Sequence, residues 1–299
     1  MEILEKALGD KKAIALFVLP PLIIFIGIVF IPIIWTLYYS LHSGMPGLKF
    51  EFNGIKNYFK LFTDKAFITS LKMNLKYVVI VTTGQVTMGL LTALMFHFVV
   101  KKYKVLVRTI VFFPVVLPGV AVAQLFSKMF EITPTYGLIN ALLEAVGLTQ
   151  FIQPWLGKGS TAFAILCLMD IWTAIGFYAV IIYGALVDIS GEIIEAAKID
   201  GANSMQLFRK ILIPLLKPIL MTCTIFSLTG TLKMFETATA LTGGGPGNAT
   251  RSLSMYMYDT AFTYSEYGYG SAIAIFILAE CLLVTWMVTL FNRKEKEVV

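Results

Sequence analysis

Asp170 is the one charged residue in the apolar stretch 161–187, where a carboxyl group could bind a polar solute. Residues three, four or seven positions apart share one face of a helix, so Asp170 shares a face with Thr173 and Phe177. Sugars present hydroxyl groups to polar side chains and apolar ring faces to aromatic rings. The spacing therefore predicts one wall of a path for a polyhydroxylated solute.

A second set of polar residues lies on one helical face of the apolar stretch 218–237. This face carries Ser227, Thr231 and Met234. Polar groups within membrane-spanning helices usually face a cavity or a partner. Alternatively, these hydroxyl groups bond to the backbone carbonyls of their own helices, as Ser and Thr often do in membranes. The spacing leaves both roles open.

Composition places these helices in a lipid environment. Hydrophobic residues make up 58% of the 299 residues and charged residues 14%, more apolar surface than a soluble fold can bury. A transmembrane helix needs roughly 20 apolar residues. Six stretches qualify: 13–41, 77–96, 109–127, 161–187, 218–237 and 267–292. We expect an all-α, polytopic membrane protein with six transmembrane helices in a single domain, residues 1–299.

Basic residues predict the orientation of the chain in the membrane. They gather before the first stretch, after the second, after the fourth and in the tail: Lys6, Lys11, Lys12, Lys101, Lys102, Lys104, Arg108, Lys198, Arg209, Lys210, Lys217, Arg293, Lys294 and Lys296. Cytoplasmic segments carry such an excess, so both termini are expected in the cytoplasm. The five lysines of loop 42–73 argue against this orientation. The net charge of +6 follows the membrane surface, and no nucleic acid partner is expected.

The sequence contains no pattern for catalysis or metal binding. Cys167, Cys223 and Cys281 lie singly in apolar stretches, which predicts neither a disulfide framework nor a metal site. No nucleophile or acid–base set converges, so we expect no catalytic residue and no enzyme activity. A GxxxxGK[ST] phosphate loop is missing, and the glycines of 243–247 are not followed by the lysine that such a loop requires. The chain therefore cannot hydrolyse ATP by itself.

The connection between the fourth and fifth stretches is expected to form two short helices on the cytoplasmic side. Ser190 can cap the first helix, and Gly201 supplies the permissive backbone that ends it. Asn203 or Ser204 can cap the second, which Pro214 interrupts. These signals predict a compact helical hairpin.

The amino-acid sequence of this connection resembles a known signature. EAAKIDGA, residues 195–202, resembles the cytoplasmic EAA loop of permease subunits of binding-protein-dependent ABC importers. The resemblance continues at fixed offsets through Phe208, Ile211, Pro214 and Pro218. Ile213 stands where the family usually has Leu. The resemblance implies that 188–213 is a hairpin that couples to a separate ATPase, through Glu195, Ala196, Ala197, Asp200 and Gly201.

Two further segments resemble carbohydrate-type permeases of this family. FNGIKNYFKLFTD, residues 52–64, resembles their outer segment after the first span, and its interleaved aromatic residues and lysines also suit an interfacial helix. LTGGGPGNAT, residues 241–250, resembles the outer loop of disaccharide, raffinose-like and glycerol-phosphate permeases. In that loop the resemblance implies contact with a binding protein through Gly243, Gly244, Gly245 and Pro246.

Together these resemblances imply the ABC importer permease fold and a role as permease subunit of an ATP-driven carbohydrate, oligosaccharide-type importer. The chain would form half of the translocation pathway in a bacterial inner membrane. The implied partners are a second homologous permease subunit, a dimer of ATPase subunits, an extracytoplasmic sugar-binding protein and membrane lipid. No cofactor is expected on this chain, since ATP and Mg would bind the ATPase.

Two alternatives remain open. A permease of the same kind could carry a non-sugar solute such as glycerol phosphate, although an anionic cargo would favour basic groups in the cavity. A proton-coupled secondary transporter could instead use Asp170 and Glu280, the carboxyl groups inside the fourth and sixth stretches.

Overall fold

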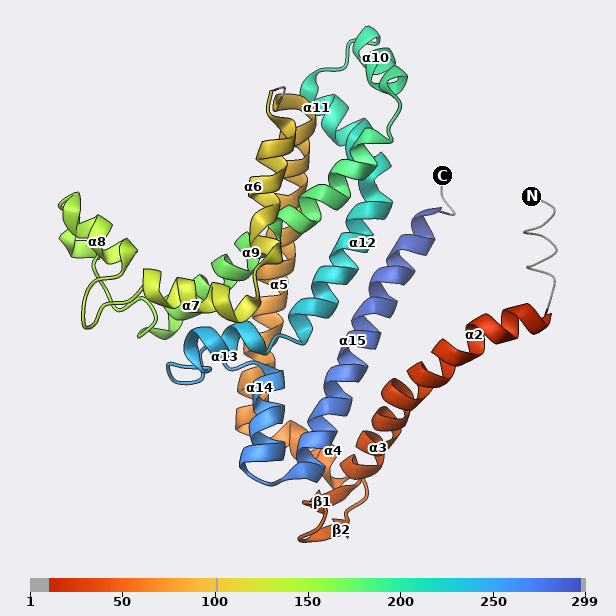
Figure 1. The fold of residues 1–299 in the computed structure, drawn as a ribbon, viewed down its shortest axis with the longest axis vertical. Coiled ribbons are helices and arrows are strands. Elements are labelled where there is room, and N and C mark those ends of the chain that lie inside the picture. Colours follow the sequence, from red (N-terminus) through yellow and green to blue (C-terminus); the bar gives the residue numbers. More distant parts are fainter. Residues whose placement is uncertain (1–10, 101, 297–299) are drawn as a thin grey trace. The chain divides into compact units, whose positions relative to one another are not determined.

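The protein is almost entirely helical in the computed structural model, which describes residues 11–100 and 102–296 (Figure 1). Lys6 and Lys101, which contribute to the predicted orientation, lie outside the described residues. The chain divides into two compact units. Unit 1 comprises Met1–Thr63 and Met257–Phe276, and unit 2 comprises Asp64–Tyr256 and Ile277–Val299.

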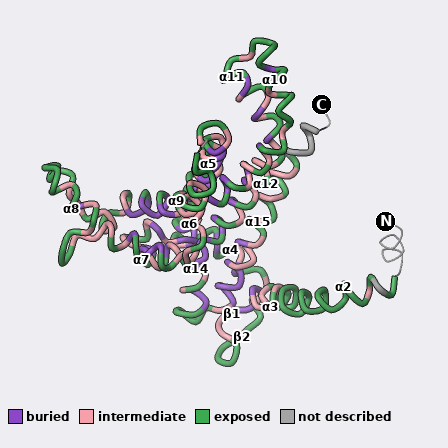
Figure 2. Tube along the Cα trace, turned by 45° about the horizontal axis from the view of Figure 1, so that its top comes forward, coloured by how far each residue is buried: buried purple, intermediate pink, exposed green. Residues whose placement is uncertain are grey.

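Unit 1 begins with an apolar, membrane-length helix. Its elements are α2 (Lys11–Phe25), the π-helical segment η1 (Ile26–Phe30), α3 (Ile31–Ser40), β1 (His42–Gly44), β2 (Phe50–Phe52), α4 (Lys56–Thr63), the π-helical η5 (Asp259–Thr263) and the start of α15 (Tyr267–Lys296). The described residues of α2 are almost all exposed, as the green colour in Figure 2 shows, and most of them are apolar. A helix that is apolar all round is stable only in a membrane or a large core.

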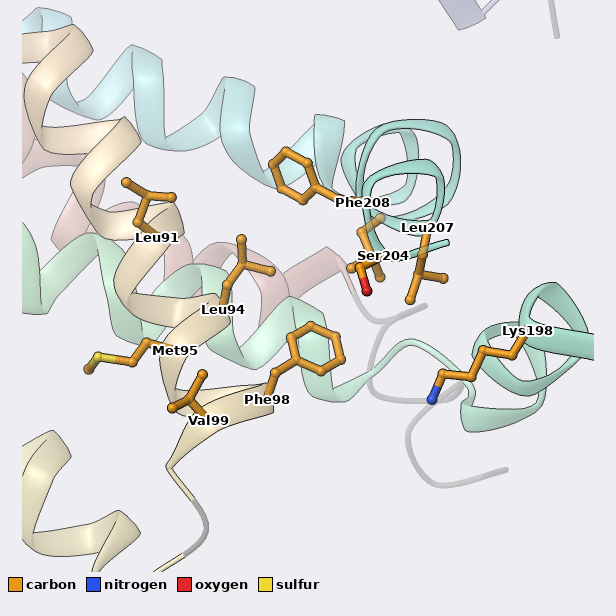
Figure 3. A pocket seen from close by; sticks show the side chains of 10 residues that line it. Leu91, Leu94, Met95, Phe98, Val99, Lys198, Ser204, Leu207 and Phe208 are labelled. Atoms are coloured by element: carbon orange, nitrogen blue, oxygen red, sulfur yellow. The ribbon is translucent and has the colours of Figure 1, made fainter. Parts of the chain in front are cut away.

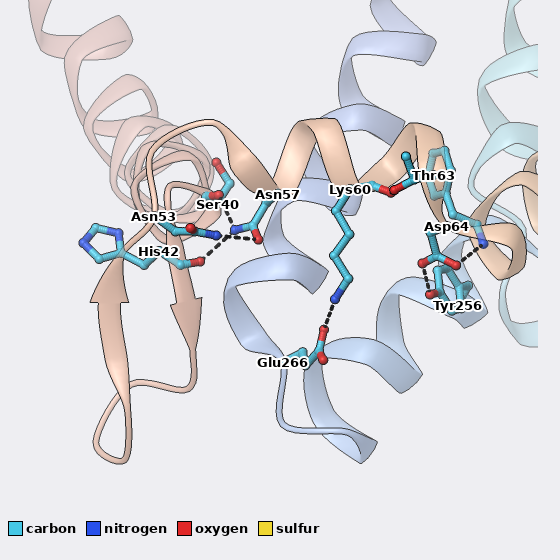
Figure 4. Close-up of polar contacts among 10 residues, drawn as sticks. Ser40, His42, Asn53, Asn57, Lys60, Thr63, Asp64, Tyr256 and Glu266 are labelled. Atoms are coloured by element: carbon cyan, nitrogen blue, oxygen red, sulfur yellow. Dashed lines mark hydrogen bonds and ion pairs between the residues drawn. The ribbon is translucent and has the colours of Figure 1, made fainter.

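Polar contacts hold the rest of unit 1 together (Figure 4). Asn57 on α4 donates to the carbonyls of Ser40, at 2.8 Å, and His42, at 2.7 Å. Lys60 forms an ion pair with Glu266 at 2.6 Å. This pairing offsets one of the five lysines of the loop that opposes the predicted orientation.

Unit 2 is built around two long helices that pack closely. Its elements are α5 (Lys65–Leu94), the π-helical η2 (Met95–Val99), α6 (Lys104–Val116), α7 (Gly119–Met129), α8 (Leu138–Ala145), the 3₁₀ turn η3 (Thr149–Phe151), α9 (Gly159–Val187), α10 (Gly191–Ile199), α11 (Ser204–Leu207), the π-helical η4 (Phe208–Leu212), α12 (Ile213–Leu232), α13 (Glu236–Thr242), most of α14 (Leu253–Tyr258) and the end of α15.

Glycines let the central helices of unit 2 approach each other. A methyl group at Gly89 of α5 would lie 2.5 Å from Cβ of Tyr178 on α9. A methyl group at Gly176 would lie 2.4 Å from the carbonyl oxygen of Val111 on α6. Small residues serve this purpose between membrane helices, because close backbone approach maximises packing. Helices α5, α6 and α9 are therefore fixed relative to one another.

The third predicted span is wrong as a single helix. Residues 109–127 belong to α6 and α7, whose axes differ by 96°. Leu117 and Pro118 between them adopt extended backbone conformations. Proline lacks an N–H group and disfavours the helical conformation of the residue before it, so the helix breaks there.

The start of the fifth span also differs from the prediction. Pro214 does not interrupt a short helix, because α11, η4 and α12 run as one helix over Ser204–Leu232. Pro214 lies in the first turn of α12, directly after the wider π-helical turns of η4. Membrane helices tolerate an internal proline where a local π-helical adjustment accommodates the missing N–H. The second arm of the predicted hairpin is thus the beginning of a spanning helix.

The prediction of an all-α polytopic membrane protein is confirmed. Within the described residues, five helices are long and apolar enough to cross a membrane: Ile14–Ser40, Lys65–Val99, Gly159–Val187, Ser204–Leu232 and Tyr267–Leu290. The bent pair α6–α7 gives the sixth span if it is counted as one.

Candidate functional site

Asp170 lies at the centre of a polar network between helices of unit 2. Its Oδ2 accepts hydrogen bonds from the hydroxyl of Tyr77 on α5 and from Thr237 Oγ1 on α13, the latter at 3.1 Å. Tyr77 is only 2% exposed. A buried hydroxyl requires an acceptor, and this carboxyl group serves two donors from different helices. Asp170 therefore joins α5, α9 and α13.

Gln85 extends the network to α12. Its Nε2 donates to the Asp170 backbone carbonyl at 3.0 Å, and its Oε1 accepts from Ser227 Oγ at 2.7 Å. Ser227 also contacts Thr82 at 3.0 Å. The amide thus bridges α9 and α12 from its place on α5. Gln85 therefore contributes to helix packing through specific hydrogen bonds to α9 and to α12.

These helices enclose an open cavity of about 270 Å³. Its lining consists of hydroxyl, amide, carboxyl, aromatic and small apolar groups: Tyr77, Gln85, Asp170, Thr173, Ala174, Tyr178, Phe226, Ser227, Gly230, Thr231, Met234 and Thr237. Neither lysine nor arginine occurs among these lining residues. Such a surface can bind hydroxyl groups and an apolar ring face, and it offers no cation to an anionic solute.

The structure brings together five of the six residues predicted for the pathway. Asp170, Thr173, Ser227, Thr231 and Met234 all line the cavity. The sixth, Phe177, does not line it, and its ring packs edge-on against Tyr178 with centroids 5.2 Å apart. Tyr178, the next residue along α9, does line the cavity, so the direction of the Phe177 side chain, and not its distance from Asp170, excludes it.

The hydroxyl groups of the cavity behave in two ways. Thr173 and Thr231 donate to carbonyls of their own helices, those of Met169 and Ser227, each at 2.8 Å. Ser227 instead bonds to side chains of α5. Both roles that the spacing left open are therefore present. Each hydroxyl that donates within its helix keeps oxygen lone pairs available to a solute.

Sequence reasoning missed Tyr77 and Thr237 as members of this site. Tyr77 begins the second predicted span, where an aromatic residue reads as an interfacial anchor. Thr237 lies beyond the end of α12, on the separate helix α13. The prediction extended one helix to residue 237, so it could not place this hydroxyl opposite Asp170. A buried carboxyl group in need of donors was the available signal.

The predicted hairpin forms at one end of unit 2 and is capped as expected. Ser190 Oγ accepts from the Glu192 N–H at 3.3 Å. Asn203, not Ser204, caps α11, in a reciprocal capping box with Gln206. Gly201 ends α10 at φ +82°, a left-handed conformation that costs other residues about 1–2 kcal/mol. A connection of four residues thus turns the chain sharply between α10 and α11.

The predicted coupling residues differ in accessibility. Glu195, Ala196, Asp200 and Gly201 are exposed, whereas Ala197 is only 7% exposed. Ala197 belongs to an apolar cluster with Leu186, Leu207, Leu212 and Leu216. This cluster holds α10 against α9 and α12. The outer face of α10 remains uncovered.

An apolar groove runs beside this hairpin (Figure 3). It has a volume of about 560 Å³ and lies between the turns around Leu207 and the end of α5 with η2, including Leu94 of α5 and Phe98 of η2. The Lys198 ammonium group of α10 points toward its edge in Figure 3. The surfaces of the hairpin and of the end of α5 that face this groove are therefore not covered by each other.

The glycine-rich loop lies at the opposite end of α9. Thr250 Oγ1 donates to the Gly245 carbonyl at 2.8 Å and contacts Thr242 Oγ1 at 2.6 Å, so hydrogen bonds close this turn. A methyl group at Gly159, the first residue of α9, would lie 2.9 Å from Cβ of Ala249. The 29 residues of α9 span about 43 Å, more than the apolar thickness of a bilayer. The loop and the hairpin therefore lie toward opposite membrane surfaces.

Glu280 does not join Asp170 in the cavity. Its Oε2 is buried and has no hydrogen-bond partner among the described residues. The cavity lining does not include it. Within residues 11–100 and 102–296, no group of three His, Cys, Asp or Glu side chains is arranged to hold a metal ion. The alternative that Asp170 and Glu280 form one proton path thus lacks a shared cavity.

A set of membrane-length helices around a polar cavity, with an exposed helical hairpin at one end, defines a membrane transport protein. A family model described as "Binding-protein-dependent transport system inner membrane component" matches residues 85–297, which include the hairpin and every lining residue of the cavity except Tyr77. The chain belongs to this family and is a permease subunit, as the resemblance of its EAA loop implied.

Individual relatives agree along nearly the whole chain. It is 36% identical to a probable ABC transporter permease protein, YurN of Bacillus subtilis, over 97% of this chain and 99% of that protein. It is 32% identical to the sulfoquinovosyl glycerol transport system permease SmoG of Agrobacterium fabrum (93% and 89%), and 33% identical to the multiple sugar-binding transport system permease MsmF of Streptococcus mutans (87% and 88%).

The fold also matches a solved structure. A chain of a bacterial ABC transporter involved in import of the acidic polysaccharide alginate superposes with a TM-score of 0.83. The match covers 98% of this chain and 99% of that chain, at 23% sequence identity. The ABC importer permease fold implied by the resemblance is therefore confirmed.

Proposed function

We propose that this chain carries an uncharged carbohydrate, as one of two permease subunits of an ATP-driven importer. The observation that carries this proposal is the cavity around Asp170, which combines hydroxyl groups and aromatic rings and has no cation among its lining residues. Relatives named for sugar transport support the cargo class. The same cavity disfavours anionic cargo such as glycerol phosphate, because nothing in it would neutralise a phosphate group.

Within the pathway, we assign the contact with sugar hydroxyls to Asp170, Thr173, Ser227 and Thr231. Phe226 supplies the exposed ring for an apolar sugar face, since it lines the cavity and is 54% exposed. Met234 closes the apolar part of the wall. Phe177, which we predicted from spacing, is left out because it does not line the cavity.

The exposed face of α10 is the proposed contact with the ATPase subunit. Glu195 would pair with a basic group of that subunit, and Ala196 and Gly201 would permit close approach. Asp200 is the remaining exposed residue of this proposed contact. Ala197 would act indirectly, because it anchors α10 to the apolar cluster around Leu207. Movement of the ATPase dimer on binding ATP and Mg would then reach α9 and α12 through this cluster.

Contacts near the hairpin also support the proposed topology. Basic segments before α6 and around η4 lie at the hairpin end of unit 2, because Arg108 contacts Tyr183 near the end of α9. The excess of positive charge favours the cytoplasm for this end and for both termini. The turn Gly243–Gly244–Gly245–Pro246, at the other end of α9, is the proposed contact with an extracytoplasmic sugar-binding protein. The proposed location of the protein is a bacterial inner membrane.

An uptake experiment tests the proposal. The complex of this chain with its partner subunits and binding protein is reconstituted in liposomes, and ATP-dependent uptake of neutral and anionic oligosaccharides is compared. We expect ATP-dependent uptake of a neutral oligosaccharide and no uptake of the anionic ones. Uptake that follows a proton gradient without ATP, or that is restricted to anionic sugars, would contradict the proposal.

A matched pair of variants locates the sugar contact. Phe226→Ala removes a ring that lines the cavity, and Phe177→Ala removes a ring outside it. We expect Phe226→Ala to raise the half-saturating sugar concentration several-fold and Phe177→Ala to leave it nearly unchanged. If both variants changed the half-saturating sugar concentration equally, the cavity would not be the site of sugar contact.

A further inference from the structure

A second cavity, between α6 and α9, has a different chemistry. This cavity, the Arg108 groove, has a volume of about 360 Å³ and is lined by Arg108, Thr109, Phe112, Phe113, Val116 and Val180. It shares no lining residue with the Asp170 cavity. The sugar pathway and the hairpin therefore leave it unexplained.

Arg108 is a partly buried cation without a counter-ion among the described residues. Its Nη2 donates to the Tyr183 hydroxyl at 2.6 Å, and its guanidinium group lies 4.0 Å from the centre of that ring. Its Nε is buried and has no hydrogen-bond partner among the described residues. No described carboxyl group forms an ion pair with it. Tyr183 thus holds the guanidinium in place while leaving its charge uncompensated.

The basic residue Lys104 adds positive charge at the same end of the groove. Lys104 begins α6 and lies four residues before Arg108, so both project from one face of the helix. Lys104 is exposed and, like Arg108, has no described ion-pair partner. The mouth of the groove therefore favours an anion.

The rest of the groove is apolar and open to the surroundings. Phe113, Val116 and Val180 are 59%, 69% and 41% exposed. These residues follow Arg108 along one to two turns of α6 and one turn of α9. The groove has a fixed shape, because Gly176 lets α6 contact α9 at backbone distance. The groove thus has a cationic end at Arg108 and an apolar part that runs along the helix. This combination matches a molecule with an anionic head group and an apolar chain.

We propose that the Arg108 groove binds an anionic glycerophospholipid. Its phosphate group would accept hydrogen bonds from the guanidinium of Arg108, and an acyl chain would lie along Phe113, Val116 and Val180. Basic pockets between membrane helices bind anionic head groups in this way, and arginine is well suited to phosphate because it offers several N–H donors in one plane. Bound lipid would stabilise the contact of α6 with α9, beside the cluster that supports the hairpin.

Lipid retention by the whole complex tests this proposal. The complex with its partner subunits is purified in detergent, supplied with phosphatidylglycerol or phosphatidylcholine of identical acyl chains, and analysed by native mass spectrometry. We expect preferential retention of phosphatidylglycerol, which Arg108→Gln lowers about fivefold, as expected for one basic group acting on an anionic lipid. Arg108→Lys should preserve most of the preference, and Arg209→Gln, an exposed arginine outside the groove, should preserve all of it.

A second variant addresses the trough without changing charge. Val180→Trp fills the groove and leaves Arg108 in place, so it should also lower retention of phosphatidylglycerol. It decides the matter if Arg108→Gln fails to assemble. The proposal is overturned by equal retention of both lipids, by unchanged retention in Arg108→Gln or Val180→Trp, or by disulfide cross-linking of Val116→Cys to the second permease subunit, which would then occupy the groove.

Discussion

The Asp170 cavity and helix α10 satisfy their polar groups in opposite ways. Around Asp170, donors and acceptors from α5, α9, α12 and α13 meet one another inside the bundle. On α10, Ser190 and Gly201 complete the ends of the helix, while Glu195 and Asp200 have no described side-chain partner and face outward. In the first region, the polar groups of this network find their hydrogen-bond partners within this chain. In the second, the charged side chains of Glu195 and Asp200 are available to bind another protein.

This contrast indicates which region responds to which partner. An internally bonded cavity keeps its shape without solute, as a selective pathway requires. A short, capped helix with small exposed residues can seat closely in another protein without rearranging itself. Substitutions in the cavity should therefore affect stability and sugar binding, whereas substitutions on α10 should affect coupling and leave the fold intact.

The largest effect is expected from Glu195→Lys on α10 combined with Gly201→Asp in the turn that follows it. Reversing the charge and adding a side chain at the closest point should lower sugar-stimulated ATP turnover by roughly tenfold or more, since like charges placed together at an interface cost several kcal/mol. The assembled complex is assayed with and without sugar-loaded binding protein. Glu144→Lys, an exposed glutamate on α8, is the matched control. Normal stimulation in the α10 variant would contradict a coupling role.

Next in size is the loss of the Asp170 carboxyl group. Asp170→Ala leaves the hydroxyl groups of Tyr77 and Thr237 without an acceptor and should destabilise the fold by about 1–3 kcal/mol. Asp170→Asn retains one acceptor oxygen and should cost less. Unfolding in detergent measures both changes. If Asp170→Ala is as stable as the natural sequence, the network does not hold the helices together.

Close packing around the cavity gives the third prediction. Gly176→Ala places a methyl group 2.4 Å from the carbonyl oxygen of Val111 and should cost about 1–3 kcal/mol of stability. Gly184→Ala, two turns further along α9, meets nothing within 4 Å and should be neutral or stabilising, because alanine favours helices by about 1 kcal/mol. The difference between their unfolding transitions is the measurement. Equal stability would place α6 further from α9.

The smallest effect is expected at the cap of α11. Asn203→Ala removes the side-chain oxygen that accepts from the Gln206 N–H, one of the two bonds of the capping box, and should cost about 1 kcal/mol locally. Hydrogen exchange of the amides in Ser204–Leu207 should become faster, with little change in the protection of α5 or α9. Ser204→Ala, at the neighbouring position, should have almost no effect. Faster exchange throughout unit 2 would mean that the hairpin and the bundle unfold together.

Much of this molecule follows from local sequence signals. Apolar length predicted the spanning helices, and capping residues predicted both ends of α10. The break at Pro118 and the continuous helix through Pro214 did not follow, because the effect of a proline depends on its position within the hydrogen-bonded turns. Tyr77 and Thr237 were missed for a related reason: a hydroxyl group becomes part of a site only when the packing of separate helices brings it to Asp170. Exposure of α10 was implied by its resemblance to the EAA loop, whereas burial of Ala197 required the structure.

The most direct test of the account is cross-linking from the outer face of α10. Ala196→Cys is introduced in the assembled complex, together with Phe177→Cys as an exposed position outside α10, and each is treated with a short bifunctional thiol reagent. We predict a cross-link from position 196 to the ATPase subunit, which ATP binding alters, and none from position 177. A complex that is active but yields no link from position 196 to the ATPase would contradict the central claim that α10 is the coupling element.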